Sequence, residues 1–88
     1  MAKMGADPEQ LRALGKKFEQ EAQQIEQAER QISSQLKSAW WEGKDGDKFR
    51  SEWDGQFAAS LRKISEALKQ AGQVVRKQAE QQQQTSAA

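Results

Sequence analysis

The chain has 88 residues and a formal net charge of +1, and it contains neither cysteine nor histidine. This length predicts one small domain. The missing Cys and His exclude disulfides, thiol nucleophiles and zinc-finger ligands, and the near-zero charge gives no general attraction to nucleic acid or anionic lipid. The segment MAKMGADPEQ has no apolar stretch, so we expect no cleaved secretory signal, and no run approaches the roughly 20 apolar residues of a membrane span.

The first predicted element is a long amphipathic helix over about 8–41. Asp7 is a good N-cap, and Pro8 suits the first helical position, where its missing N–H has no partner to lose. Large apolar residues then recur in steps of three and four, or in their sums, within a stripe roughly 120° wide. They are Leu11, Leu14, Phe18, Ile25, Ile32, Leu36 and Trp40. A seven-residue spacing within this set indicates a coiled-coil-like seam.

A break follows over about 42–46. Gly43 and Gly46 favour a chain reversal, because glycine adopts positive φ without a steric penalty. Asp45 and Asp47 beside them are typical caps of a following helix. The spaced ligands and distal glutamate of a calcium loop are missing, so we predict no metal site here.

A second helix is predicted over about 47–80, with an apolar stripe of the same width. Its large apolar residues are Phe49, Trp53, Phe57, Leu61, Ile64, Leu68 and Val75. Residues 81–88 are Gln-rich at first and then small and polar, which predicts a flexible tail. Nothing in the chain alternates with period two, so we expect no strand.

Two helices of similar length joined by a short turn predict an all-α, antiparallel helix-turn-helix hairpin that spans residues 1–88 as one domain. A stripe 120° wide is poorly covered by a single neighbouring helix. We therefore predict an obligate dimer, homodimeric or heterodimeric, that forms a four-helix bundle. The large apolar residues of both helices are its expected core and dimer interface.

The predicted turn carries Trp41-Glu42-Gly43, with Phe49 six residues after the glycine and Trp53 four residues further on. This layout resembles the WxG family, also called the early-secreted-antigen-like proteins, over essentially the whole chain. Members are helical hairpins with Trp-X-Gly in the turn. Gly46 departs from the family pattern, which more often has alanine there, and we expect it to delay the second helix by a turn.

The resemblance implies a non-enzymatic substrate of type VII secretion. Such proteins leave the cell as folded dimers without a cleaved signal peptide, are recognised by a membrane-associated ATPase, and act as effectors, export partners or adaptors. Trp41 and Gly43 would form the turn and part of the export-recognition motif. Because Trp40 continues the apolar stripe, we expect Trp40 to be buried and Trp41 to be the more exposed indole.

The family's second export signal is a tyrosine followed four positions later by an acidic residue. This chain has no tyrosine, and Arg76 stands at the corresponding position before Glu80. We therefore expect that a different WxG-like partner, or a larger secreted protein with such a domain, carries the signal.

The remaining charged residues give no support for catalysis. Acidic residues such as Glu26 and Glu29 fall on polar helical faces and are expected to be solvated, and we predict no catalytic residue and no cofactor. A basic cluster on the second helix is either a solvated face or a docking surface for an acidic partner or lipid headgroups; no aromatics are interleaved with it, so nucleic-acid binding is not expected. It comprises Arg62, Lys63, Lys69, Arg76 and Lys77. The alternative function is an intracellular coiled-coil scaffold that is never exported, in which Trp-X-Gly is only a turn.

Overall fold

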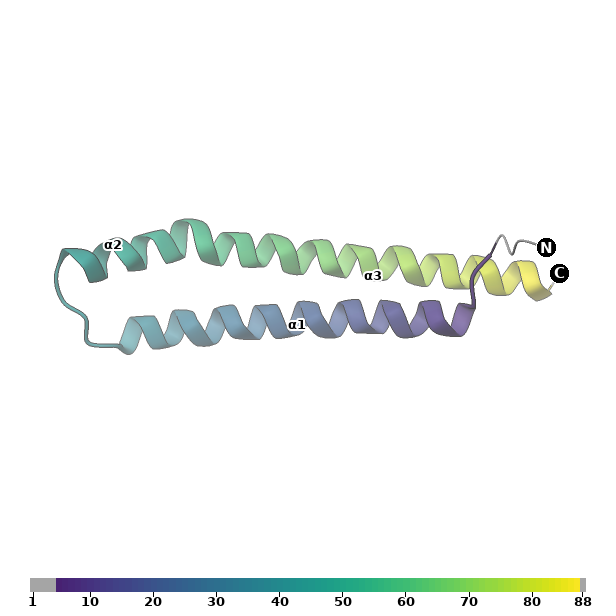
Figure 1. Ribbon diagram of the computed structural model, residues 1–88, viewed down its shortest axis with the longest axis horizontal. Coiled ribbons are helices and arrows are strands. Elements are labelled where there is room, and N and C mark those ends of the chain that lie inside the picture. Colours follow the sequence, from purple (N-terminus) through teal and green to yellow (C-terminus); the bar gives the residue numbers. More distant parts are fainter. Residues whose placement is uncertain (1–4, 88) are drawn as a thin grey trace.

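The computed structural model describes residues 5–87, and over them the chain is a long hairpin of two helical limbs (Figure 1). The first limb is α1 (Pro8–Ser38). The second is made of α2 (Lys44–Glu52), one π-helical turn η1 (Trp53–Phe57) and α3 (Ala58–Ala87). The start of α1 and the end of α3 lie together at the end opposite the turn (Figure 1). The predicted all-α hairpin is confirmed, and residues 5–87 contain no strand.

The start of α1 follows the prediction. Oδ1 of Asp7 accepts a hydrogen bond from the backbone N–H of Glu9 at 2.9 Å, and Pro8 is the first helical residue. The carboxylate satisfies one of the four N–H groups that a helix N-terminus leaves without a partner.

The turn begins earlier than predicted, since α1 ends at Ser38 rather than near Trp41. The guanidinium of Arg50 donates to the carbonyl oxygens of Leu36, Ala39 and Trp41, at 3.1, 2.8 and 2.8 Å. These bonds satisfy carbonyl groups at and beyond the end of the helix, which have no partner within it. A side chain from the other limb therefore ends α1, and the local sequence contains no signal for this.

The second limb also begins earlier than predicted, at Lys44. Gly46 does not delay it. This glycine is buried against the turn, where an added Cβ would lie 2.5 Å from the carbonyl oxygen of Trp41. The N-cap is Gly43, at φ 108°, and Asp45 and Asp47 lie in the first turn without a capping hydrogen bond. The predicted capping role of these two aspartates is wrong, although their charges favour a helix N-terminus.

At the other end, α3 continues through the predicted tail to Ala87; Ala88 and residues 1–4 lie outside the described residues. Glutamine is a good helix former, and the last turns still pack beside α1. The guanidinium of Arg12 donates to the side-chain oxygen of Gln83, and Ala79 is fully buried.

The contact between α1 and α3 is lined mainly by small residues that recur every seven positions. These buried residues are Gly15, Ala22 and Glu29 on α1 and Ala58, Ser65, Gly72 and Ala79 on α3. At the glycines the two backbones nearly touch, since a Cβ on Gly15 would lie 3.2 Å from the carbonyl oxygen of Gly72. We call this contact the seam. It leaves no room for the large apolar residues, which lie beside it.

The π-helical turn η1 adjusts the second limb to the seam. Trp53 and Ala58 both face α1, although they are five positions apart where an α-helix repeats after three or four. The extra residue allows the indole N–H of Trp53 to donate to Oγ of Ser33 at 2.8 Å while Ala58 stays in the seam.

Candidate interaction surfaces

The hairpin has two different faces, one on each side of the seam. Phe18 and Ile25 lie four residues before seam positions on α1, and Leu61 and Leu68 have the same offset on α3. Because the two helices are antiparallel, an equal offset from the seam places the apolar row of α1 and the apolar row of α3 on the same face of the hairpin. We call it the apolar face. It consists of Leu11, Leu14, Phe18, Ile25, Ile32, Phe57, Leu61, Ile64, Leu68 and Val75.

None of the large side chains of the apolar face is buried by the hairpin itself. Leu14, Ile32, Phe57 and Ile64 are each 44–49% exposed, and the others are half-buried. Among the described residues, the buried hydrophobic side chains are Ala22, Ala58 and Ala79. A hairpin whose buried apolar core consists of alanines gains little hydrophobic free energy to offset the conformational entropy that a long chain loses on folding.

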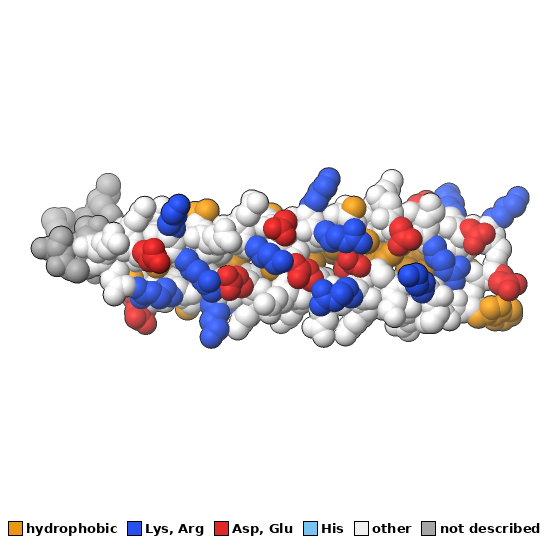
Figure 2. All heavy atoms as spheres, turned by 180° about the vertical axis from the view of Figure 1, so that it is seen from behind, with side chains coloured by type: hydrophobic (Ala, Val, Ile, Leu, Met, Phe, Trp, Pro, Cys, Tyr) orange, Lys and Arg blue, Asp and Glu red, His pale blue; other side chains and the backbone are white. Residues whose placement is uncertain are grey.

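The opposite face carries ion pairs between the limbs, as Figure 2 shows by the Lys, Arg, Asp and Glu side chains gathered where the two helices meet. Arg62 pairs with Glu29 at 2.9 Å, Lys69 with Glu26 at 2.5 Å, and Arg76 with Glu19 at 2.7 Å. The cations lie seven residues apart on α3. We call these six residues the ion-pair face. The basic cluster predicted from sequence is thus partly engaged within the chain, while Lys63 and Lys77 are exposed.

Two carboxylates of this face are held more firmly than the sequence suggested. Hydrogen bonds from Lys69 and then Ser65 lower the pKa of Glu26, and hydrogen bonds from Ser33 and then Arg62 lower the pKa of Glu29. The same pair raises the pKa of Lys69, chiefly through its hydrogen bond to Glu26. Glu29 is only 8% exposed, so the expectation that it is solvated is wrong. Its place on the seam brings it between Ser33 and Arg62.

At the turn, the two adjacent indoles have the opposite exposure to that predicted. Trp40 is 88% exposed and Trp41 is 42% exposed. Helical phase does not apply to Trp40, because α1 has already ended at Ser38. Trp41 packs on the first turns of the second limb, where its ring centroid lies 5.7 Å from that of Phe49 and its backbone covers Gly46.

The remaining residues of the predicted interface divide between two places. Phe49 belongs to the aromatic cluster at the turn, which continues through Phe57 to Trp53 with centroid separations of 6.4 and 6.3 Å. Leu36 and Trp53 line a groove on the side of the ion-pair face. Sequence reasoning missed Arg50 and Ser33 altogether, since a lone Arg or Ser on a polar helical face carries no sign of a cross-limb hydrogen bond.

These features define a class of protein. The chain is a small helical hairpin with a Trp-X-Gly turn, an uncovered apolar face and an opposite face that is largely satisfied by its own ion pairs. Within residues 5–87 no helix is long and apolar enough to cross a membrane.

Residues 3–86 match the WXG100 family, described as proteins of 100 residues with WXG, and the chain belongs to that family. Members are small, non-enzymatic helical proteins associated with type VII secretion, and they typically form dimers with partners. No curated protein and no solved structure shows a significant match to this chain.

Proposed function

We propose that this protein is exported by type VII secretion as one half of a four-helix bundle, and that it acts as an effector, an export partner or an adaptor rather than as an enzyme. The observation that carries the proposal is the family match over residues 3–86. The hairpin agrees with it, since Trp41-Glu42-Gly43 lies in the turn between the two limbs.

The dimer follows from the apolar face. Ten large apolar side chains lie along one face of a molecule 66 Å long, and the hairpin covers none of them completely. A second hairpin laid on this face would cover both rows at once, which is the arrangement of a four-helix bundle. The partner is a second copy of this chain or another WxG-like protein, and dimer formation is expected to be coupled to folding.

The turn is the proposed recognition end. Trp41 and Gly43 shape it, and Trp40 presents an indole that nothing in the described chain covers. In an antiparallel dimer, the turn of one chain lies near the chain ends of its partner, so the two together form a composite surface for the secretion ATPase. Exposed indoles are frequent anchors of such contacts.

Arg76 supports a division of labour within the dimer. This residue stands where the family's second signal has tyrosine, and its guanidinium is engaged by Glu19 at 2.7 Å. A side chain engaged on the ion-pair face cannot fill an apolar docking pocket as tyrosine would. We therefore propose that a partner chain supplies the second signal.

Export is tested by following the tagged chain in culture filtrate, with a cytosolic marker as the control for lysis. The proposal expects the chain in the filtrate of wild-type cells and its loss when the secretion ATPase is deleted. A chain that stays inside wild-type cells would instead indicate the intracellular scaffold. Efficient export after deletion of every WxG-like relative would contradict the partner-borne signal.

A further inference from the structure

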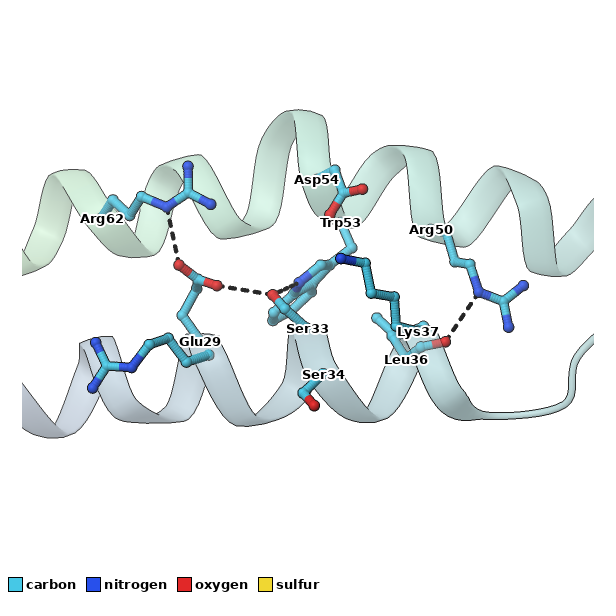
Figure 3. Close-up of a pocket in the computed structure, with 10 residues that line it drawn as sticks. Glu29, Ser33, Ser34, Leu36, Lys37, Arg50, Trp53, Asp54 and Arg62 are labelled. Carbon is cyan, nitrogen blue, oxygen red and sulfur yellow. Dashed lines mark hydrogen bonds and ion pairs between the residues drawn. The ribbon is translucent and has the colours of Figure 1, made fainter.

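The strongest feature outside the apolar face and the turn is a groove of about 430 Å³ on the side of the ion-pair face (Figure 3). It lies where η1 carries the second limb past Trp53, just beyond the small residues of the seam. Its residues come from both limbs: Glu29, Arg30, Ser33, Ser34, Leu36, Lys37, Arg50, Trp53, Asp54 and Arg62.

The groove has an excess of positive charge. Its cations are Arg30, Lys37, Arg50 and Arg62, against two carboxylates. One of these carboxylates, Glu29, already accepts hydrogen bonds from Ser33 at 2.8 Å and from Arg62 at 2.9 Å. Its charge is therefore largely compensated, and a further negative group would meet an attractive field.

The cations of the groove differ in how many hydrogen bonds and ion pairs they make within the hairpin. Arg50 is committed to three carbonyl oxygens at the end of α1. Arg62 donates to Glu29 through Nε, and its terminal nitrogens point away from that carboxylate (Figure 3). Lys37 makes no hydrogen bond or ion pair within the described chain, and Figure 3 shows its side chain reaching into the space between the limbs.

The groove also has an apolar part beside these cations. Leu36 and the indole of Trp53 line it, and the hydrogen bond from Trp53 Nε1 to Ser33 Oγ fixes the ring in place. A multiply charged phosphate gains little from such an apolar surface, and Asp54 on the same rim would repel it more strongly than it would repel a single carboxylate. A single carboxylate next to an apolar side chain fits both parts.

We propose that this groove binds an acidic peptide segment of a partner protein, in which a carboxylate lies between Lys37 and Arg62 and a neighbouring apolar side chain rests on Leu36 and Trp53. The groove lies on the opposite side of the seam from the apolar face. If a second hairpin covers that face, as the proposed function holds, the groove stays open in the dimer and can engage a third chain.

The test uses the full chain, labelled with ¹⁵N, and follows the indole N–H signal of Trp53, which is assigned by its loss in Trp53→Phe. The probe is an acetylated and amidated hexapeptide of alternating Glu and Leu, and the matched control replaces each Glu by Gln. The proposal expects a saturable shift of the Trp53 signal with the Glu peptide, weakened by added salt, and no shift with the Gln peptide.

A matched pair of variants separates the groove from general charge attraction. Lys37→Gln is expected to weaken binding about three- to fivefold, whereas Lys48→Gln, at an exposed α2 position outside the groove, should change it less than about twofold. The proposal is overturned by no shift, by equal shifts with both peptides or with inorganic phosphate, or by equal losses in both variants. Because the assay uses purified protein, its result does not depend on whether the chain is exported.

Discussion

Two glycines of the second limb predict opposite responses to the same substitution. At Gly46, an alanine Cβ would lie 2.5 Å from the carbonyl oxygen of Trp41 and 3.0 Å from its indole, whereas at Gly55 nothing lies within 4 Å. Alanine in place of glycine in a helix gains about 0.5–1 kcal/mol, because glycine loses more backbone entropy on folding. Gly55→Ala should therefore raise the free energy of unfolding by roughly that amount.

Gly46→Ala gains the same free energy from the higher helix propensity of alanine, but its Cβ must displace the backbone of the turn. Overpacking of this kind costs typically about 1–3 kcal/mol, and a contact of 2.5 Å with a backbone atom belongs in the upper part of that range. We expect a net loss of about 1–2 kcal/mol.

The measurement is thermal unfolding followed by circular dichroism, with all chains at one concentration because the proposed dimerisation would couple to stability. For a domain of this size, 1 kcal/mol shifts Tm by roughly 4–8 °C. Gly46→Ala should melt below and Gly55→Ala above the wild type. If both variants shift in the same direction, the close packing of the turn on α2 is wrong.

Three further outcomes are expected. Gly43→Ala should lower the free energy of unfolding by about 1–3 kcal/mol, because the combination of φ 108° with ψ −179° is open almost only to glycine. A urea midpoint of this variant equal to that of the wild type would contradict the prediction. The folded-state pKa values of Glu26 and Glu29 are lowered, so their contribution to stability is present above about pH 4 and is lost as pH falls through those lowered values. The folded-state pKa of Lys69 is raised, so its contribution to stability is present at neutral pH and is lost only as pH rises through the raised value. In a plot of urea midpoint against pH, Glu26→Gln should reduce both the fall at acidic pH and the fall at basic pH. An unchanged plot would show that the ion pair between Glu26 and Lys69 is not formed. Ile64→Glu, at a 49%-exposed position of the apolar face, should abolish the proposed dimer in sedimentation equilibrium. The control Gln73→Glu, exposed on the same helix, should leave that dimer intact. A wild-type chain that is a stable, fully helical monomer at micromolar concentration would refute the interface itself.

The helical limbs, the N-cap at Asp7 and the place of the turn could be predicted from sequence, because they depend on local chemistry: apolar spacing, a capping carboxylate and a cluster of glycines. The same reasoning went wrong at the ends of the elements. The end of α1 depends on hydrogen bonds from Arg50, and the close packing at Gly46 depends on the backbone of Trp41. Both contacts join residues that are adjacent only after the hairpin has closed.

Heptad spacing of large residues identified the apolar face but not the contact between the two limbs. The contact between α1 and α3 uses a second heptad, which runs from Gly15 to Ala79 and consists mainly of small residues. Small side chains at a regular spacing score weakly in any hydrophobic pattern, although they let two backbones approach more closely than large ones do.

By itself, then, the order of residues determined that this protein is helical, where it reverses and which side of each limb is apolar, since each of these follows from interactions between near neighbours in the chain. Only the tertiary structure decided which of two heptads forms the seam, that Trp40 rather than Trp41 is the exposed indole, and that Glu19, Glu26 and Glu29 meet the cations of α3. Those outcomes depend on the distance and rotation between two helices, and these are set by the small residues where the limbs touch.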